Sequence, residues 1–96
     1  FIPENFTLFQ NYPNPFNPVT KINYELKIKN YVSLKVYDVL GNEVAALVNK
    51  KQNAGSYEVS FEGSNFSSGV YFYKIEITTD NSNEVYSDTK RMILLK

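Results

Sequence analysis

Three of the four prolines of the chain fall within six residues, inside the segment 11–18 (NYPNPFNP). Proline fixes φ at about −65° and has no backbone N–H, so this segment cannot lie in a helix or inside a sheet ladder. Residues before proline are restricted to extended geometry. We therefore expect a stiff, extended crossing, with Tyr12 and Phe16 as aromatic anchors that plug the end of a β-sandwich. Pro15 and Pro18 also match the P-x-x-P pattern of peptide ligands, but no basic residue flanks them.

Runs of alternating apolar and polar residues follow one another along the rest of the chain. A period of two with one polar face is typical of antiparallel strands that have one side in water. We expect strands at residues 6–10, 19–26, 31–39, 43–50, 57–62, 70–78 and 85–95, with turns between them at 27–30, 38–42 and 79–83. The segment 43–50 also fits one helical turn, and its strand neighbours favour a strand. The pattern predicts an all-β fold, an antiparallel immunoglobulin-like β-sandwich of about seven strands.

The apolar positions that share a face define the expected core. Its predicted members are Leu8, Ile22, Tyr24, Leu26, Val32, Leu34, Val36, Tyr57, Val59, Tyr71, Tyr73, Ile75, Met92 and Leu94. Phe66 lies in the loop 63–69, and we expect it to fold back as a plug because a large aromatic side chain is costly to leave in water.

Charge and composition exclude several classes of function. Ten basic and ten acidic residues cancel, so no overall field attracts nucleic acid or an anionic membrane. The chain has no cysteine and no histidine, which argues against zinc, haem and nucleophile–histidine sites. No apolar run approaches the ~20 residues of a membrane helix. We expect no enzyme activity, no cofactor, no metal site, no nucleic-acid partner and no transmembrane segment.

Two weaker binding patterns remain open. Residues 80–84 carry five oxygen-bearing side chains in a row, which indicate a turn more strongly than a weak calcium site. Tyr31, Tyr37 and Phe72 could form an outward row that stacks on sugars, or they could be ordinary cross-strand pairs. The second possibility for function is therefore a passive or sugar-binding β-sandwich module that accompanies a larger secreted hydrolase.

The end of the chain is apolar on both faces of its last strand. The residues concerned are Lys90, Arg91, Met92, Ile93, Leu94, Leu95 and Lys96. One face can enter the core, whereas the other needs a covering element or a partner. The segment is either a central strand buried on both sides or an edge that a receptor extends by strand addition.

An ordered set of motifs resembles the type A C-terminal sorting domains of the type IX secretion system. Such domains form the C-terminus of many secreted proteins of Bacteroidetes-related bacteria. The set begins at residues 8–20 and continues through 22–26, 36–38 with Gly41, 47–48, 54–57 and 68–73 to the terminal 90–96. Its motif residues are Asn11, Pro13, Asn14, Pro15, Phe16, Asn17, Pro18, Gly41, Gly55 and Gly69. Lys27 departs from the family, which usually has proline there. The immunoglobulin-like domain of flagellar hook-capping proteins shares only parts of the pattern.

This resemblance implies a role as a sorting signal for secretion. The partners would be the outer-membrane type IX translocon, a sortase-like peptidase and the upstream cargo of the same chain. The cargo would be secreted or held at the cell surface, and the domain would be removed or exchanged for a surface anchor. Residues 90–96 would be the part that is recognised. We expect residues 1–96 to be a single domain cut from a longer protein, with residues 1–5 as a linker from the cargo.

Overall fold

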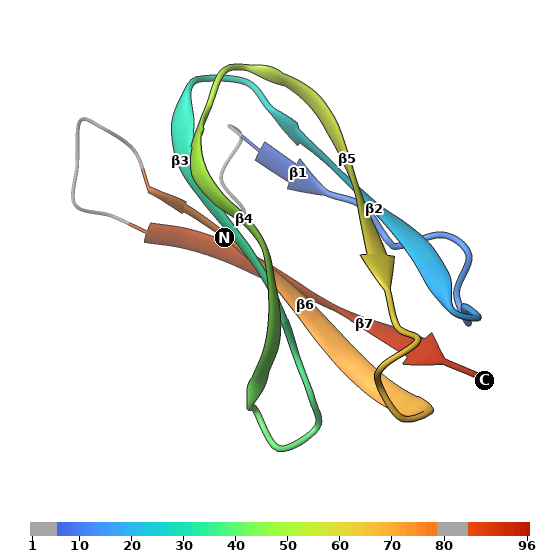
Figure 1. Ribbon diagram of the computed structural model, residues 1–96. Helices are drawn as coiled ribbons and strands as arrows, with labels where there is room; N and C mark the ends of the chain where they lie inside the picture. Colours follow the sequence, from blue (N-terminus) through green and yellow to red (C-terminus); the bar gives the residue numbers. More distant parts are fainter. Residues whose placement is uncertain (1–5, 79–84) are drawn as a thin grey trace.

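Two antiparallel sheets pack face to face in the computed structural model, which describes residues 6–78 and 85–96 (Figure 1). The strands are β1 (Phe6–Leu8), β2 (Val19–Leu26), β3 (Asn30–Tyr37), β4 (Glu43–Gln52), β5 (Gly55–Glu62), β6 (Gly69–Thr78) and β7 (Val85–Leu94). One sheet has the order β1-β2-β5 and the other β4-β3-β6-β7. No helix occurs in the described ranges. The predicted all-β sandwich is confirmed.

Most strand bounds follow the alternation in the sequence, and the differences lie at the ends. The segment 43–50 is a strand, not a helical turn, and it continues to Gln52. β1 ends at Leu8, earlier than expected. Asn30 was expected in a turn, but it begins β3 with its side chain 1% exposed, and its Nδ2 donates to the Ile28 carbonyl at 2.9 Å. The expected turn at 79–83 lies outside the described residues.

The core occupies the space between the sheets, and it contains most of the residues that the alternation predicts. Tyr57 and Val59, on β5 at the edge of the smaller sheet, differ because they are only partly buried. The buried apolar residues beyond the predicted list are Phe6, Phe16, Val48, Phe61 and Ile77. Phe61 lies on the same strand as Tyr57 and Val59 but is buried, since the rings of Phe16 and Phe66 pack against it.

The turn between β3 and β4 is held by one aspartate. Asp38 Oδ1 accepts hydrogen bonds from the Leu40 and Asn42 backbone N–H groups, at 2.9 and 3.0 Å. Gly41 has φ of +85°, a left-handed conformation that glycine adopts without steric cost. The predicted turn is confirmed, and it leaves Val39 and Leu40 exposed.

Candidate functional site

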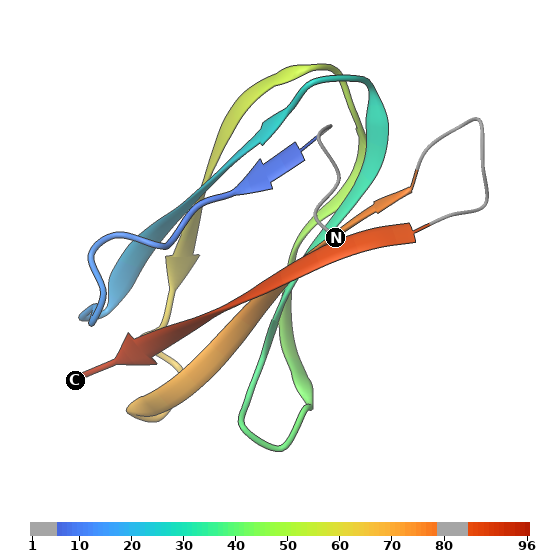
Figure 2. The same ribbon diagram turned by 180° about the vertical axis from the view of Figure 1, so that it is seen from behind.

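Residues 9–18, called the strap below, connect β1 to β2. Figure 2 shows the strap in blue, looping at the end of the molecule where the C-terminus lies. The chain bends at residues 13–15 and again at 17–18. The expected extended crossing is therefore wrong in shape, because the segment bends twice. The Tyr12–Pro13, Asn14–Pro15 and Asn17–Pro18 peptide bonds are cis.

The strap covers the outer edge of β7 at its C-terminal end. The Phe16 N–H donates to the Ile93 carbonyl, and the Leu95 N–H donates to the Phe16 carbonyl, both at 2.9 Å. The Ile93 N–H donates to Asn14 Oδ1 at 3.0 Å. Gln10 Nε2 donates to the Arg91 carbonyl at 2.8 Å. The backbone N–H and carbonyl groups on the open edge of β7, between residues 91 and 95, thus bond to the strap as they would to a neighbouring strand.

The Phe16 side chain plugs the end of the sandwich, as the sequence predicts. It is 1% exposed and packs edge-on against Phe61, with ring centroids 5.9 Å apart. Phe61 also stacks on Phe66 at 5.6 Å, and Phe66 is partly buried against the core as expected. Tyr12 is 81% exposed, so its expected role as a second anchor is wrong. Its backbone, not its ring, pairs with Lys21 on β2.

A buried polar network holds the start of the strap. The Tyr73 hydroxyl donates to the Phe9 carbonyl at 2.8 Å and accepts from the Asn11 N–H at 2.7 Å. Asn11 Nδ2 donates to Thr20 Oγ1 at 2.9 Å and to the Pro13 carbonyl at 3.2 Å. Thr20 Oγ1 donates to the same carbonyl at 2.8 Å. Burial raises the pKa of Tyr73 to about 12, so this hydroxyl stays protonated and able to donate.

The predicted recognition residues 90–96, called the tail below, fall on different sides of β7. Met92 and Leu94 are fully buried, while Arg91 and Leu95 are exposed and Ile93 is half-buried. The tail is therefore neither buried on both faces nor open along its edge. Lys90 is half-buried at the next inward position of the strand. Beyond β7, the Lys96 N–H donates to Ser68 Oγ at 2.9 Å, and Lys96 Nζ donates to the Ser64 carbonyl at 2.5 Å.

The motif residues of the strap differ in their contacts and in their exposure to solvent. Asn11, Asn14 and Phe16 make the contacts described above, whereas the Asn17 side chain is exposed. The Pro18 carbonyl accepts a bond from the Gly63 N–H at 2.8 Å.

The motif glycines lie apart from one another. Gly41 is in the β3–β4 turn, Gly55 begins β5 opposite Leu26, and Gly69 begins β6 opposite Leu94. All three have positive φ, of 85°, 152° and 153°. The motif therefore marks both the strap and backbone positions that suit glycine.

Sequence reasoning missed Gly63, a buried glycine under the strap. A Cβ added there would lie 3.0 Å from Leu94 Cδ2 and 3.3 Å from both Phe16 Cε2 and the Pro18 carbonyl oxygen. It also missed Thr20, although Thr20 shares the inward face of Ile22 and that alternation could have revealed it. Nothing local marks Gly63, because its neighbours come from both ends of the chain.

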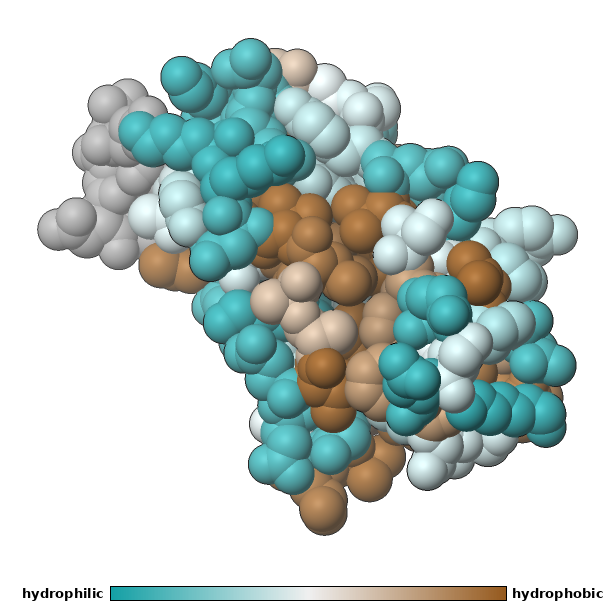
Figure 3. Space-filling model, in the orientation of Figure 1, coloured by the Kyte–Doolittle hydropathy of each residue, from teal (hydrophilic) through white to brown (hydrophobic). Residues whose placement is uncertain are grey.

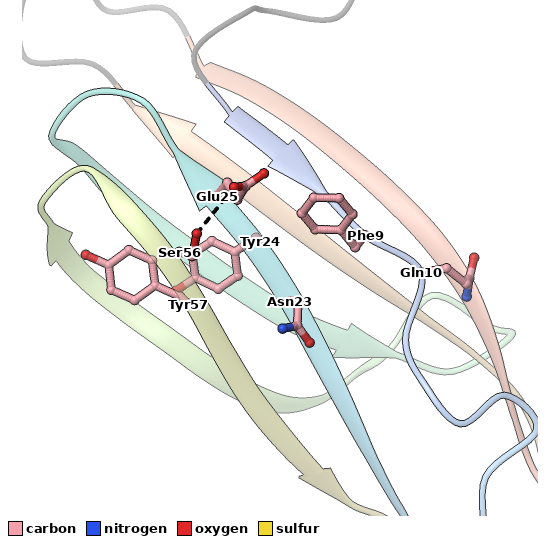
Figure 4. Close-up of a pocket in the computed structure, with 7 residues that line it drawn as sticks. All are labelled: Phe9, Gln10, Asn23, Tyr24, Glu25, Ser56 and Tyr57. Atoms are coloured by element: carbon pink, nitrogen blue, oxygen red, sulfur yellow. Dashed lines mark hydrogen bonds between the residues drawn. The ribbon is translucent and has the colours of Figure 1, made fainter.

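Two of the hollows on the described part of the molecule lie on different sheets. One of ≈ 400 Å³ lies beside Phe9 and Glu25, where Ser56 Oγ donates to Glu25 Oε2 at 3.3 Å (Figure 4). The other, of ≈ 340 Å³, lies beside Tyr37 and Phe72. Within 6–78 and 85–96, no three acidic, histidine or cysteine side chains gather as a metal site would require.

The expected aromatic row is only partly assembled. Tyr37 and Phe72 are directly opposite each other on β3 and β6. Tyr31 lies at the other end of β3, opposite Thr78, and its hydroxyl donates to Asn49 Oδ1. The three rings therefore do not form one platform, and the pair that remains is an ordinary cross-strand neighbour pair.

Fold and site together define a small immunoglobulin-like β-sandwich in which a proline-rich strap holds the C-terminal strand. The chain belongs to the family of secretion system C-terminal sorting domains, whose model matches residues 10–93. The match covers residues 10–18 of the strap and the strands from β2 to β7 except Leu94, so the type IX resemblance is confirmed. No curated protein matches the chain. In the described residues, no helix has the length and apolar character needed to cross a bilayer.

Solved structures share the fold at low identity. Dimeric latent PorU from Porphyromonas gingivalis superposes with a TM-score of 0.73 at 17% identity, over 94% of this chain and 9% of the PorU chain. CopC from Methylosinus trichosporium OB3b gives 0.56 at 12% identity, over 93% of this chain and 92% of that one. A Parabacteroides merdae β-glucuronidase gives 0.56 at 12%, over 94% and 13%. The likeness in fold covers only a small part of the length of the PorU chain.

Proposed function

We propose that this chain is a non-catalytic signal that directs a larger protein, to which it is attached, through the outer membrane by the type IX secretion system. The family match over residues 10–93 carries the proposal. The fold it shares with a segment of PorU supports it. All of residues 1–96 act as one domain in this proposal, and residues 1–5 link it to the cargo.

Its partners are the outer-membrane translocon, which reads the folded domain, and a sortase-like peptidase, which removes it. The cargo is then released outside the cell or joined to a surface anchor. Residues 90–96 are the part that is read, and the strap keeps them in place. Fixed geometry favours such reading, because a partner then loses less entropy in ordering the segment that it binds.

The direct test is export of a reporter. A periplasmic reporter that carries residues 1–96 at its C-terminus should reach the medium or the cell surface in a host with a working type IX translocon. The reporter alone should stay in the periplasm, and so should the fusion in a host that lacks the translocon. A fusion that is folded and stable yet stays periplasmic in the competent host would overturn the proposal.

Removal of the domain is tested on the exported product. Mass spectrometry of the reporter from the medium should show a C-terminus upstream of Phe6, the start of the described fold. An exported reporter that still carries the whole domain would contradict removal, while leaving the export role intact.

A deletion of residues 90–96 is a poor test of recognition. It removes Met92 and Leu94, which are fully buried, together with the edge to which the strap bonds. Truncating buried side chains of this size costs about 2–5 kcal/mol each, a large part of the stability of a small domain. Loss of export would then report unfolding. Substitutions confined to outward side chains separate folding from recognition.

A further inference from the structure

The C-terminal strand has three surfaces that a partner could read: its inward face, its outer edge and its outward face. The inward face is taken by the core, since Met92 and Leu94 are fully buried. The outer edge between residues 91 and 95 is taken by the strap through Phe16, Asn14 and Gln10. Strand addition at this edge would first have to displace a buried phenylalanine and four hydrogen bonds. The outward face remains.

That outward face continues from the tail onto the neighbouring strands. Ile93 lies opposite Val70, and Arg91 lies opposite Phe72. Phe72 in turn lies opposite Tyr37 on β3. All five residues are at outward positions and none is fully buried. We call Tyr37, Val70, Phe72, Arg91 and Ile93 the tail face.

The tail face combines the apolar side chains of Val70, Phe72 and Ile93 with the cation of Arg91. Lys35 and Lys74, on the same side of the sheet, pair with Glu43 at 3.1 Å and with Glu76 at 3.8 Å. Arg91 makes no ion pair with any residue in the ranges 6–78 and 85–96. An exposed guanidinium opposite Phe72 suits a protein surface that brings a carboxylate.

We propose that the receptor docks on the tail face, with apolar side chains over Val70, Phe72 and Ile93 and a carboxylate paired to Arg91, and not by adding a strand to the edge of β7. The proposal rests on the sorting function proposed above. It explains why the apolar outward residues of the tail stay uncovered while the strap closes the edge beside them.

The test uses the reporter fusion with substitutions that leave the core and the strap untouched. Arg91→Glu and Ile93→Thr should each lower export about tenfold or more, as expected for central residues of an interface. Arg91→Lys, which keeps the charge, should retain most of the export. Lys29→Glu is the matched charge control in the β2–β3 turn. Tyr31→Ser is the control at the far end of the same sheet face.

One variant separates the face from the edge. Asn14→Ala removes the bond from the Ile93 N–H and leaves that edge donor free for an added strand, while the two backbone bonds of Phe16 to Ile93 and Leu95 still hold the strap in place. Docking on the tail face leaves export of this variant unchanged, whereas strand addition predicts that it rises. Thermal unfolding of each purified variant shows whether it is folded at the temperature of the export assay, and only folded variants are compared.

Each outcome bears on one claim. Loss of export in both Arg91→Glu and Ile93→Thr, with normal controls and a normal Asn14→Ala variant, supports the tail face. Normal export of both face variants overturns it, and so does increased export of Asn14→Ala. Loss in Arg91→Glu alone points to an anionic glycan or headgroup and overturns a protein surface. Failure of the unmodified fusion to be exported counts against the sorting function itself.

Discussion

The two long sides of the sandwich are closed in different ways. On one side the strap spans from β1 to β7 and supplies backbone and side-chain hydrogen bonds to the β7 edge. On the other side lie β4 and β5, the other edges of the two sheets, and their apolar side chains pack against the core. Figure 3 shows the result, an apolar area in the middle of the face that carries β4 and β5. The partly buried apolar residues of these strands are Val44, Ala45, Leu47, Tyr57 and Val59.

The difference shows two solutions to the problem of an exposed sheet edge. β4 has register shifts against β3 between Leu34 and Lys35 and between Val36 and Tyr37, and it carries the exposed charge of Lys50. Irregular pairing and charge discourage another chain from adding to an edge. The apolar end of β7 has neither irregular pairing nor a charged residue, and the strap covers it instead. A covered edge can keep an apolar sequence and still not aggregate.

The largest expected difference between the two sides is in the cost of losing an apolar side chain. Phe16→Ala should lower the free energy of unfolding by about 3–5 kcal/mol, because the ring is fully buried and leaves a cavity. Leu47→Ala, on the β4 side, should cost only about 1–2 kcal/mol because that side chain is already partly in water. Urea denaturation of residues 1–96 measures both.

Tyr12→Ala is the control within the strap, and its effect should stay within about 0.5 kcal/mol because the ring is 81% exposed. Equal costs for Phe16→Ala and Leu47→Ala would show that the strap side is no better packed than the other.

The second prediction concerns the hydroxyl that clamps the strap. The pKa of Tyr73 is raised from 10.0 to about 12 in the folded state. The folded state thus favours the protonated form, so this stabilisation is fully present below pH 10 and is lost as the pH rises from 10 to 12. Two pKa units correspond to about 2–3 kcal/mol. Tyr73→Phe should cost a similar amount at neutral pH, since Asn11 N–H and the Phe9 carbonyl lose their partner.

Denaturation at a series of pH values gives the readout. The wild type should lose stability steeply above pH 10, and Tyr73→Phe should show a shallower decline. Burial also raises the pKa of Tyr24, which lies away from the strap, so part of the decline remains in the variant. Parallel curves of unfolding free energy against pH for wild type and variant would show that the Tyr73 hydroxyl does not hold the strap.

The third prediction tests the fit beneath the strap. Gly63→Ala should cost about 1–3 kcal/mol, because the added methyl meets Leu94, Phe16 and the Pro18 carbonyl at 3.0–3.3 Å. The same substitution combined with Phe16→Leu should cost less than the sum of the two single changes, since the smaller side chain makes room. Additive costs would show that the methyl is accommodated by movement elsewhere.

The sequence predicted what depends on local alternation. β2 has the expected bounds, and Ile22, Tyr24 and Leu26 face the core as their spacing indicates. The strap was recognised as a connector with a buried Phe16, but its bent shape and its contacts were not. Gln10 bonds to Arg91 across a sequence separation of 81 residues, and no local pattern carries such a contact. That the strap covers the edge of β7 could therefore be found only in the structure.

The smallest expected effect is also the most local. Asn14→Ala removes one hydrogen bond at the exposed edge, and it should lower the free energy of unfolding by only about 0.5–1.5 kcal/mol. Amide hydrogen exchange should respond more clearly, because the Ile93 N–H loses its acceptor while the Leu95 N–H keeps the Phe16 carbonyl. Faster exchange at Ile93 with little change at Leu95 would show that the strap is held at separate points.

Asn17→Ala is the matched control, since that side chain is exposed in the same strap. Joint loss of protection at Ile93 and Leu95 in Asn14→Ala would instead mean that the strap opens as one unit. The β7 edge would then become available in a single step, and the contrast between the two sides of the sandwich would depend on Asn14 as much as on Phe16.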